Sequence, residues 1–140
     1  MIVRTQQRTP PRCGAATIEL AVVTPVAFLF LFGIIIGALG VFRYQEVGLL
    51  AREGARYASV HGANYAFNTG NPPATAADIQ NLVKSQAVVL DPSQLTVTTA
   101  WNTDNRPGSL VTVTVNYVWV SELIFGSVTL SSSATLKMSY

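Results

Sequence analysis

The sequence combines a high apolar content with little charge: of its 140 residues, 49% are hydrophobic and 11% are charged. The chain has nine basic and seven acidic residues. Three of the arginines precede Gly14, which leaves six basic and seven acidic residues in the remainder. This distribution excludes the broad basic surface that nucleic-acid-binding proteins use.

The first fourteen residues form a basic segment without an acidic residue, with Arg4, Arg8 and Arg12 spaced along it. We interpret residues 1–14 as a leader. The only cysteine, Cys13, lies within it. A lipoprotein cut site follows its apolar region, whereas Cys13 precedes this one, so we favour a thiol with no special role. The rest of the chain then has no disulfide, and packing must stabilise it.

An uncharged apolar stretch of 23 residues runs from Leu20 to Phe42, between Glu19 and Arg43. As a helix it would be about 34 Å long, enough to cross a hydrocarbon core of about 30 Å. A buried helix of a soluble protein would be shorter and carry a polar face, and a cleavable secretory signal would be followed by a small-residue cut site. We therefore predict a retained transmembrane helix over residues 15–42.

The charges on the two flanks of this stretch predict its orientation. The flank before it carries only arginines, whereas the flank after it mixes Arg43 with Glu46 and Arg52 with Glu53. Positive flanks stay in the cytoplasm. We expect a single-pass protein with a cytoplasmic N-terminus and an extracytoplasmic C-terminal domain.

Two features within the apolar stretch predict how its helix bends and packs. Pro25 removes the hydrogen bond to the carbonyl of Ala21 and should kink the helix. Gly33 and Gly37 form a G-x-x-x-G spacing, with Gly40 near the same face, which lets two helix backbones approach closely. Chance placement of these glycines is the alternative, because apolar helices contain glycine often.

No proline or turn cluster interrupts the chain after Phe42, so we predict an amphipathic helix extension over residues 43–61. A narrow stripe of its residues recurs at three- and four-residue spacing: Tyr44, Val47, Ala51, Gly54 or Ala55, and Ala58. On the opposite side, Arg43 with Glu46 and Glu53 with Arg56 can form i,i+3 ion pairs. Glycine in a helix interior costs about 1 kcal/mol relative to alanine, and we expect a sheet packed against Gly54 to compensate.

Residues 62–140 should form a small helix-plus-sheet domain. Residues 62–73 are rich in Asn, Gly and Pro and predict a loop. Thr75 and Asp78 resemble a capping box that starts a helix through about Leu90, ended by Asp91 and Pro92. The predicted buried residues of this helix are Ala77, Leu82, Val83, Ala87 and Leu90.

Three segments alternate apolar and polar residues as strands do: residues 94–101, 110–120 and 128–138. One apolar face per strand favours an antiparallel sheet with one side covered, most simply by the outer half of the long helix. The fold class is α+β. Between the last two strands, Leu123, Ile124 and Phe125 form an apolar bulge that either caps the core or contacts a partner.

Residues suited to catalysis are sparse. His61 is the only histidine and has no spacing to other residues that would build a metal site. Asp78, Asp91 and Asp104 sit at a helix cap, a helix end and a turn, where aspartate serves backbone geometry. No nucleophile elbow or phosphate loop is present. We expect no enzyme activity, no cofactor, no metal, no nucleic-acid partner and no small-molecule substrate.

The junction between leader and apolar stretch reads Gly14-Ala15-Ala16-Thr17-Ile18-Glu19. It resembles the processing site of type IV pilin-like proteins, in which a prepilin peptidase cuts directly after the glycine. The resemblance implies a cut between Gly14 and Ala15, and it implies that Glu19 pairs with the N-terminus of a neighbouring subunit. An unpaired carboxylate at membrane depth costs about 2.5 to 3.5 kcal/mol. The alternative is that Glu19 reaches the headgroup layer and supports the first helical turn.

A second motif lies on the helix extension: Ala51-Arg52-Glu53-Gly54-Ala55-Arg56-Tyr57. Together with the junction before it, this run resembles the TadE-like family of minor pilin-like proteins, which belong to tight adherence (Flp-type) pilus systems. The resemblance implies a pilin-like fold and a place in the bacterial inner membrane, with possible incorporation in the pilus. The implied partners are the prepilin peptidase, other pilin-like subunits, the assembly platform and membrane lipid.

The sequence therefore predicts a minor pilin-like protein (pseudopilin) that acts in assembly or structure of a tight adherence pilus. Two alternatives remain. One is an uncleaved, membrane-anchored binding module, in which the sheet or the loop at Phe125 docks a soluble partner. The other is a pseudopilin of a type II-like secretion system.

Overall fold

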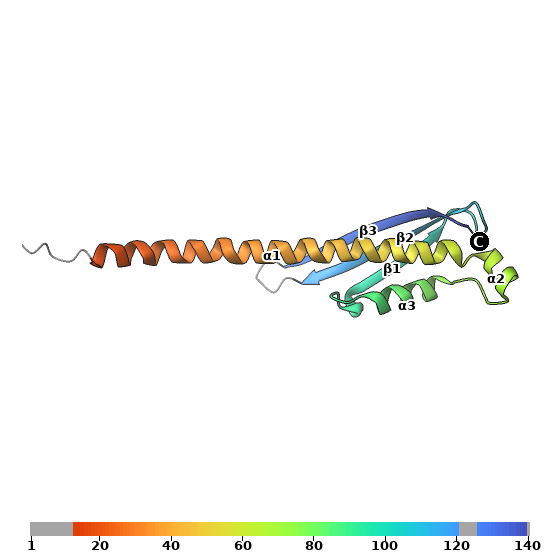
Figure 1. The fold of residues 1–140 in the computed structure, drawn as a ribbon, viewed down its shortest axis with the longest axis horizontal. Coiled ribbons are helices and arrows are strands. Elements are labelled where there is room, and N and C mark those ends of the chain that lie inside the picture. The colour runs from red at the N-terminus through yellow and green to blue at the C-terminus, as the bar shows by residue number, and fades with distance from the viewer. Residues whose placement is uncertain (1–12, 121–125, 140) are drawn as a thin grey trace, which may run out of the picture. The chain divides into compact units, whose positions relative to one another are not determined.

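The computed structural model describes residues 13–120 and 126–139 (Figure 1). Its elements, in chain order, are α1 (Cys13–Val60), α2 (Ala63–Thr69), α3 (Ala76–Gln86), a 3₁₀ turn η1 (Pro92–Gln94), β1 (Leu95–Trp101), β2 (Leu110–Val120) and β3 (Ser127–Lys137). The chain divides into two compact units, one up to Ala38 and one from Leu39 onward. The predicted α+β arrangement of a long apolar helix, short helices and a three-stranded antiparallel sheet is confirmed.

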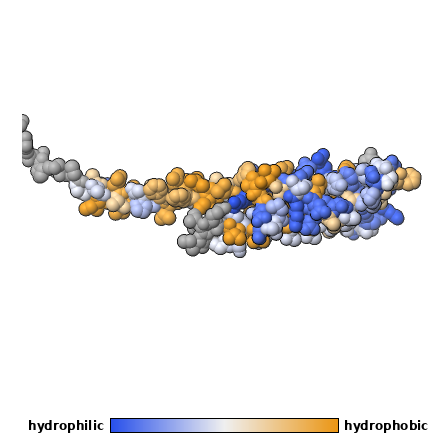
Figure 2. All heavy atoms as spheres, turned by 90° about the horizontal axis from the view of Figure 1, so that it is seen from below, coloured by the Kyte–Doolittle hydropathy of each residue, from blue (hydrophilic) through white to orange (hydrophobic). Residues whose placement is uncertain are grey.

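The first unit is the N-terminal part of α1. Its apolar side chains are exposed, and none of the residues in its most apolar window is buried by the described structure. Figure 2 shows the hydrophobic atoms along this part of the helix. A core helix of a soluble protein is mostly buried, whereas this part of α1 is not. The helix is long and apolar enough to cross a membrane. Pro25 lies inside the continuous helix, and the kink at Pro25 stays a prediction.

The second unit is built on an antiparallel sheet with the order β1-β2-β3. Its register pairs Val97 with Val115 and Val113 with Ala134, so the apolar alternation of each strand falls on one shared face. β2 supplies the centre of that face, with Val111, Val113, Val115, Tyr117 and Trp119 buried. The opposite face is polar, and Thr112 and Thr135 hydrogen-bond across it at 2.8 Å between their Oγ1 atoms. One side of the sheet is therefore a packing surface and the other faces solvent.

The C-terminal part of α1 covers the apolar face of the sheet. A methyl group added at Gly54 would lie 3.0 Å from Val83 Cγ2 and 3.1 Å from Val113 Cγ1, so α3 and β2 both approach the bare helix backbone there. The predicted packing of a sheet against Gly54 is confirmed.

Most of the predicted stripe on this part of α1 is buried: Val47, Ala51, Gly54, Ala55 and Ala58. Two residues differ from the prediction. Tyr44 is 54% exposed, whereas Leu50, which the sequence analysis omitted, is buried. The buried face of the helix is broader than the narrow stripe because a leucine is accommodated beside the small residues.

α3 begins at the predicted capping box. Thr75 Oγ1 accepts from the backbone N–H of Asp78, and Asp78 Oδ2 accepts from the backbone N–H of Thr75 at 2.9 Å. The hydrogen bond from the Thr75 backbone, followed by that from its side chain, lowers the pKa of the Asp78 carboxyl. The helix ends at Gln86, earlier than the predicted end near Leu90.

The buried side of α3 was only partly predicted. Val83 and Leu90 are buried as expected, Leu82 and Ala87 are half-buried, and Ala77 is exposed. Ile79 is fully buried and was not predicted. Ala77 is the second residue of the helix. The face that meets α1 is formed by Ile79 and Val83, which lie four residues apart.

The prediction of a loop over residues 62–73 is wrong for Ala63–Thr69, which form the short helix α2. Its N-cap, Gly62, makes no side-chain hydrogen bond, and it ends at Gly70 with φ of 75°. Glycine adopts this left-handed conformation without steric cost. The sequence analysis assigned these glycines to a loop, whereas they bound a helix. The predicted apolar bulge at Leu123, Ile124 and Phe125 lies outside the described residues.

The close packing at Gly54 yields a test. Gly54→Leu should lower the free energy of unfolding of the second unit by about 1 to 3 kcal/mol, because the larger side chain must displace Val83 and Val113. Urea unfolding of the detergent-solubilised protein, followed by tryptophan fluorescence, measures the change. The matched control is Gly33→Leu, because no atom lies within 4 Å of a methyl group placed at Gly33. Equal unfolding midpoints for the two variants would show that Gly54 is not a packing site.

Candidate functional site

The predicted processing junction lies in the first turn of α1. Gly14 is exposed, and no atom lies within 4 Å of a methyl group placed there. The first four N–H groups of a helix have no partner within the helix. The Gly14–Ala15 peptide bond therefore lies at the helix end, where backbone N–H groups lack partners within the helix. Arg4, Arg8 and the rest of residues 1–12 lie outside the described residues.

Glu19 lies four residues after Ala15 on the same helix and is exposed. Residues four apart share a helix face and are separated by about 6 Å along the axis. A cut after Gly14 would thus create an α-ammonium one turn before the Glu19 carboxylate. The spacing lets the carboxylate reach the new charge on its own chain or on a neighbouring helix.

The three glycines of the apolar stretch occupy two kinds of environment. Gly33 and Gly37 are exposed, and both have open space where a side chain would be. At Gly40, a methyl group would lie 2.9 Å from Cζ3 of Trp119. Gly40 therefore admits the indole ring of its own chain, and only Gly33 and Gly37 present a free small-residue surface. Helix packing at those two positions stays a prediction.

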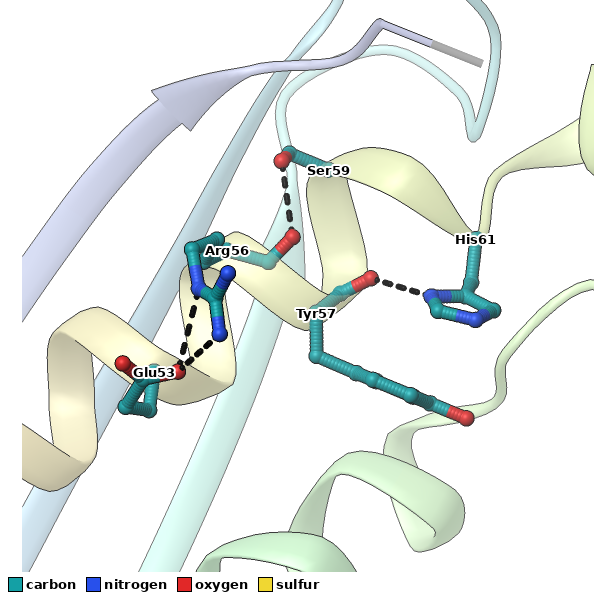
Figure 3. Close-up of polar contacts among 5 residues, drawn as sticks. All are labelled: Glu53, Arg56, Tyr57, Ser59 and His61. Carbon is teal, nitrogen blue, oxygen red and sulfur yellow. Dashed lines mark hydrogen bonds and ion pairs between the residues drawn. The ribbon is translucent and has the colours of Figure 1, made fainter.

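The motif on the helix extension is divided between two faces of α1. Ala51, Gly54 and Ala55 are buried beneath the sheet and α3, whereas Arg52 and Arg56 are exposed. The remaining charged residue, Glu53, accepts hydrogen bonds from Arg56 Nε at 3.1 Å and from Arg56 Nη2 at 2.8 Å, as Figure 3 shows. The predicted Glu53–Arg56 ion pair is confirmed. The small residues of the motif thus serve packing, and its charged residues stay on the surface.

An aromatic stack continues this face at the end of α1. The rings of Tyr57 and His61 are stacked with centroids 4.0 Å apart, and the ring of Tyr65 lies 4.4 Å from that of His61. His61 Nδ1 lies 2.9 Å from the carbonyl oxygen of Tyr57 (Figure 3).

A shallow pocket of about 240 Å³ adjoins this stack and is lined by Glu53, Arg56, Tyr57, Val60, His61, Leu82 and Gln86. Among the residues that the structure describes, no group of three or more His, Cys, Asp or Glu side chains could hold a metal ion. The contacts of His61 close the end of α1 and join it to α2.

Arg43 and Glu46, which the sequence pairs with each other, contact other parts of the chain. Glu46 Oε1 accepts hydrogen bonds from the backbone N–H groups of Val88 at 2.9 Å and Val89 at 3.1 Å. The guanidinium carbon of Arg43 lies 5.0 Å from the centroid of the Trp119 ring, a cation–π distance. Both side chains therefore connect the first turn after the apolar stretch to distant segments of the folded unit.

Two residues that position α1 on the sheet were not predicted from the sequence. Trp119 was assigned only to the apolar face of its strand, and Gly48 was given no role. A methyl group at Gly48 would lie 3.6 Å from Ser132 Oγ, so β3 passes close to the helix there. The available signal was the recurrence of glycine at positions 40, 48 and 54 of one helix, each of which contacts the sheet.

The Gly40 contact yields a second prediction. Gly40→Ala should displace the Trp119 ring and lower the free energy of unfolding of the second unit by about 1 to 3 kcal/mol. In a Trp101→Phe background, Trp119 is the only tryptophan, and its emission maximum reports the displacement directly. Gly37→Ala, where nothing lies within 4 Å, is the matched control. An unchanged Trp119 spectrum in Gly40→Ala would contradict the contact.

Comparison with known proteins identifies one family. A family model described as TadE-like protein matches residues 14–56. The match begins at the predicted processing glycine and ends at Arg56, within the motif on the helix extension, so it covers Glu19 and the whole apolar stretch. No curated protein and no solved structure matches the chain. The resemblance predicted from the sequence is thereby confirmed over residues 14–56, where the chain is similar to the TadE-like family.

Proposed function

We propose that this protein is a minor pilin-like subunit that acts in the assembly or structure of a tight adherence (Flp-type) pilus, after a prepilin peptidase removes residues 1–14. One observation carries the proposal: the TadE-like segment from Gly14 to Arg56 lies within one continuous helix, α1. The processing glycine, the acidic residue, the apolar stretch and the packing motif therefore belong to one element.

The exposed apolar surface of α1 fits this role. From Leu20 to Ala38 its large side chains are not covered by the rest of the described chain. Such a surface needs lipid or other apolar helices around it. In a subunit that passes from the bilayer into a bundle of similar helices, this apolar surface is shielded from water first by lipid and then by the neighbouring helices. The open positions at Gly33 and Gly37 allow close approach of a neighbouring helix at that step.

Glu19 supplies the recognition step of the proposal. It is the only acidic residue between Gly14 and Arg43, and its exposed carboxylate lies on the same helix face as Ala15. We assign its partner as the α-ammonium of Ala15 in a neighbouring subunit. A charge pair inside an apolar surround sets the axial register of two helices more strictly than apolar contacts do.

The proposed role is structural and not enzymatic. The carboxylates of the second unit are used in local hydrogen bonds: Asp78 at a helix cap, Asp91 with the N–H of Ser93 at 2.9 Å, and Asp104 with Ser109 Oγ at 2.6 Å. These contacts stabilise turns and helix ends. We assign them to backbone geometry, in line with the expectation from sequence.

Cleavage after Gly14 is tested by the intact mass of the protein extracted from membranes of a strain with an active prepilin peptidase. The wild-type protein should begin at Ala15, whereas Gly14→Val should retain residues 1–14, because the peptidase requires the glycine. Gly37→Val is the control and should begin at Ala15.

An uncut wild-type protein would favour the alternative of an anchored binding module. A normal Ala15 start in both the wild type and Gly14→Val would remove the processing argument. The neighbouring genes separate the two pilin-like roles. Genes for a tight adherence ATPase and platform would favour the pilus, whereas genes of a type II-like secretion system would favour a pseudopilin of that system.

Assembly is tested separately at Glu19. Glu19→Gln should still be cut after Gly14 but should be reduced at least tenfold in sheared pilus fractions or in co-purification with other pilin-like subunits, since loss of about 1.4 kcal/mol of pairing already gives a factor of ten. Glu53→Gln, at a half-buried carboxylate of the TadE-like segment that pairs with Arg56 of its own helix, is the control. Wild-type recovery of Glu19→Gln would show that Glu19 acts only on its own helix.

A further inference from the structure

Five exposed apolar residues lie at the end of the folded unit that carries Leu39 to Phe42. We call them the apolar rim: Phe42, Val88, Val89, Val120 and Val128, which are between 45% and 88% exposed. They come from four parts of the chain: α1, the segment after α3, the end of β2 and the start of β3. Figure 2 shows hydrophobic atoms gathered at this end of the unit, whereas hydrophilic atoms predominate over its remainder.

The Glu46 carboxylate fixes the position of Val88 and Val89. Its two hydrogen bonds, at 2.9 and 3.1 Å, hold the backbone after α3 against α1. Glu46 lies one helical turn beyond Phe42, about 6 Å along the axis. The most exposed residue of the rim, Val88, is therefore held at the level where the apolar stretch of α1 ends. A groove of about 370 Å³ runs between it and α1, lined by Phe42, Gln45, Glu46, Leu49, Leu50, Gln86, Val88 and Val89.

The end of the sheet reaches the same level from another side of α1. Trp119 packs on Gly40, two residues before Phe42. Val120 follows Trp119 at the end of β2, and Val128 of β3 pairs with Trp119 across the β2–β3 ladder. Gly40 and Glu46 are six residues apart, which places them on helix faces about 120° apart. The two contacts are about 9 Å apart along the axis, so the rim has members on two sides of the helix within a short axial range.

We propose that the apolar rim inserts into the interfacial layer of the lipid bilayer and seats the folded unit on the membrane surface. The inference rests on the membrane anchor of the proposed function. At the level of Phe42 the apolar stretch leaves the hydrocarbon, so the adjoining rim meets the boundary between acyl chains and headgroups. Arginine reaches from this boundary toward water, and Arg43 follows Phe42 directly in the sequence.

The arrangement of the rim favours lipid over a protein partner. A groove for a partner helix would gather its apolar residues along one side of α1. The rim has members on two sides of α1, attached at Gly40 and at Glu46, and the axial distance of about 9 Å between them fits within an interfacial layer crossed by the helix. Phe42 belongs both to the rim and to the apolar stretch, so the rim begins where that stretch ends. Phe67 is also exposed, at 93%, but lies in α2, beyond the end of α1, and serves as a comparison.

The test measures the depth of a nitroxide label in phospholipid vesicles that contain the full chain. Cys13→Ser removes the only cysteine, and Val88→Cys then carries the label. Oxygen concentrates in the bilayer, whereas a water-soluble nickel complex is excluded from it. The label at position 88 should show a ratio of oxygen to nickel accessibility several-fold higher than a label at Phe67→Cys. Val120→Cys, on the other side of the helix, should give the same result.

A third label, at Leu29→Cys within the apolar stretch, separates failure of the inference from failure of the proposed function. If the label at 29 is in lipid and those at 88 and 120 match the one at 67, the rim is in water and the inference is overturned. If positions 88 and 120 are shielded from both reagents, protein covers the rim, and the inference is equally overturned. A water-accessible label at 29 would overturn the anchor itself.

Discussion

The packing of α1 on the sheet depends on the absence of a side chain at Gly54. At this point Val83 of α3 and Val113 of β2 approach to within 3.1 Å of where a methyl group would be. Glycine destabilises a helix interior by up to about 1 kcal/mol relative to alanine, and the contact of three elements at one position offsets that cost. Because Ala51, Ala55 and Ala58 extend the same small-residue face, the helix backbone lies close to the sheet over several turns.

The surface of α1 differs between its two parts. From Leu20 to Ala38 the residues of α1 are uncharged, and none of those in its most apolar window is buried by the described chain. From Val47 onward one face is buried and the opposite face carries Arg52 and Arg56. A single uninterrupted helix therefore changes from an all-apolar to a one-sided pattern within about two turns. The short segment between them is held by Gly40 against Trp119 and by Glu46 against Val88 and Val89.

Local patterns in the sequence predicted the elements well, because their causes are local. The capping box at Thr75, the alternation along β2 and the glycine-for-sheet packing at Gly54 each depend on residues a few positions apart, and the structure confirms them. The contacts of Glu46 with Val88 and Val89 span more than forty residues, and no periodicity signals them. The helix α2 was missed for a related reason: Gly62 and Gly70 predict interruption of the chain, but not that seven residues between them are helical.

The contrast among the glycines of α1 limits where other subunits can pack. Sequence alone groups Gly33, Gly37 and Gly40 as one small-residue surface, since all three lack a side chain on a similar face. The structure separates them, because Trp119 fills the space beside Gly40 while the space beside Gly33 and Gly37 is open. From Gly40 onward one face of α1 belongs to its own sheet. Close helix-to-helix contacts on that face must therefore lie before Gly40, in the same part of the helix that carries Glu19, so register and packing of neighbouring subunits would be determined within one apolar segment.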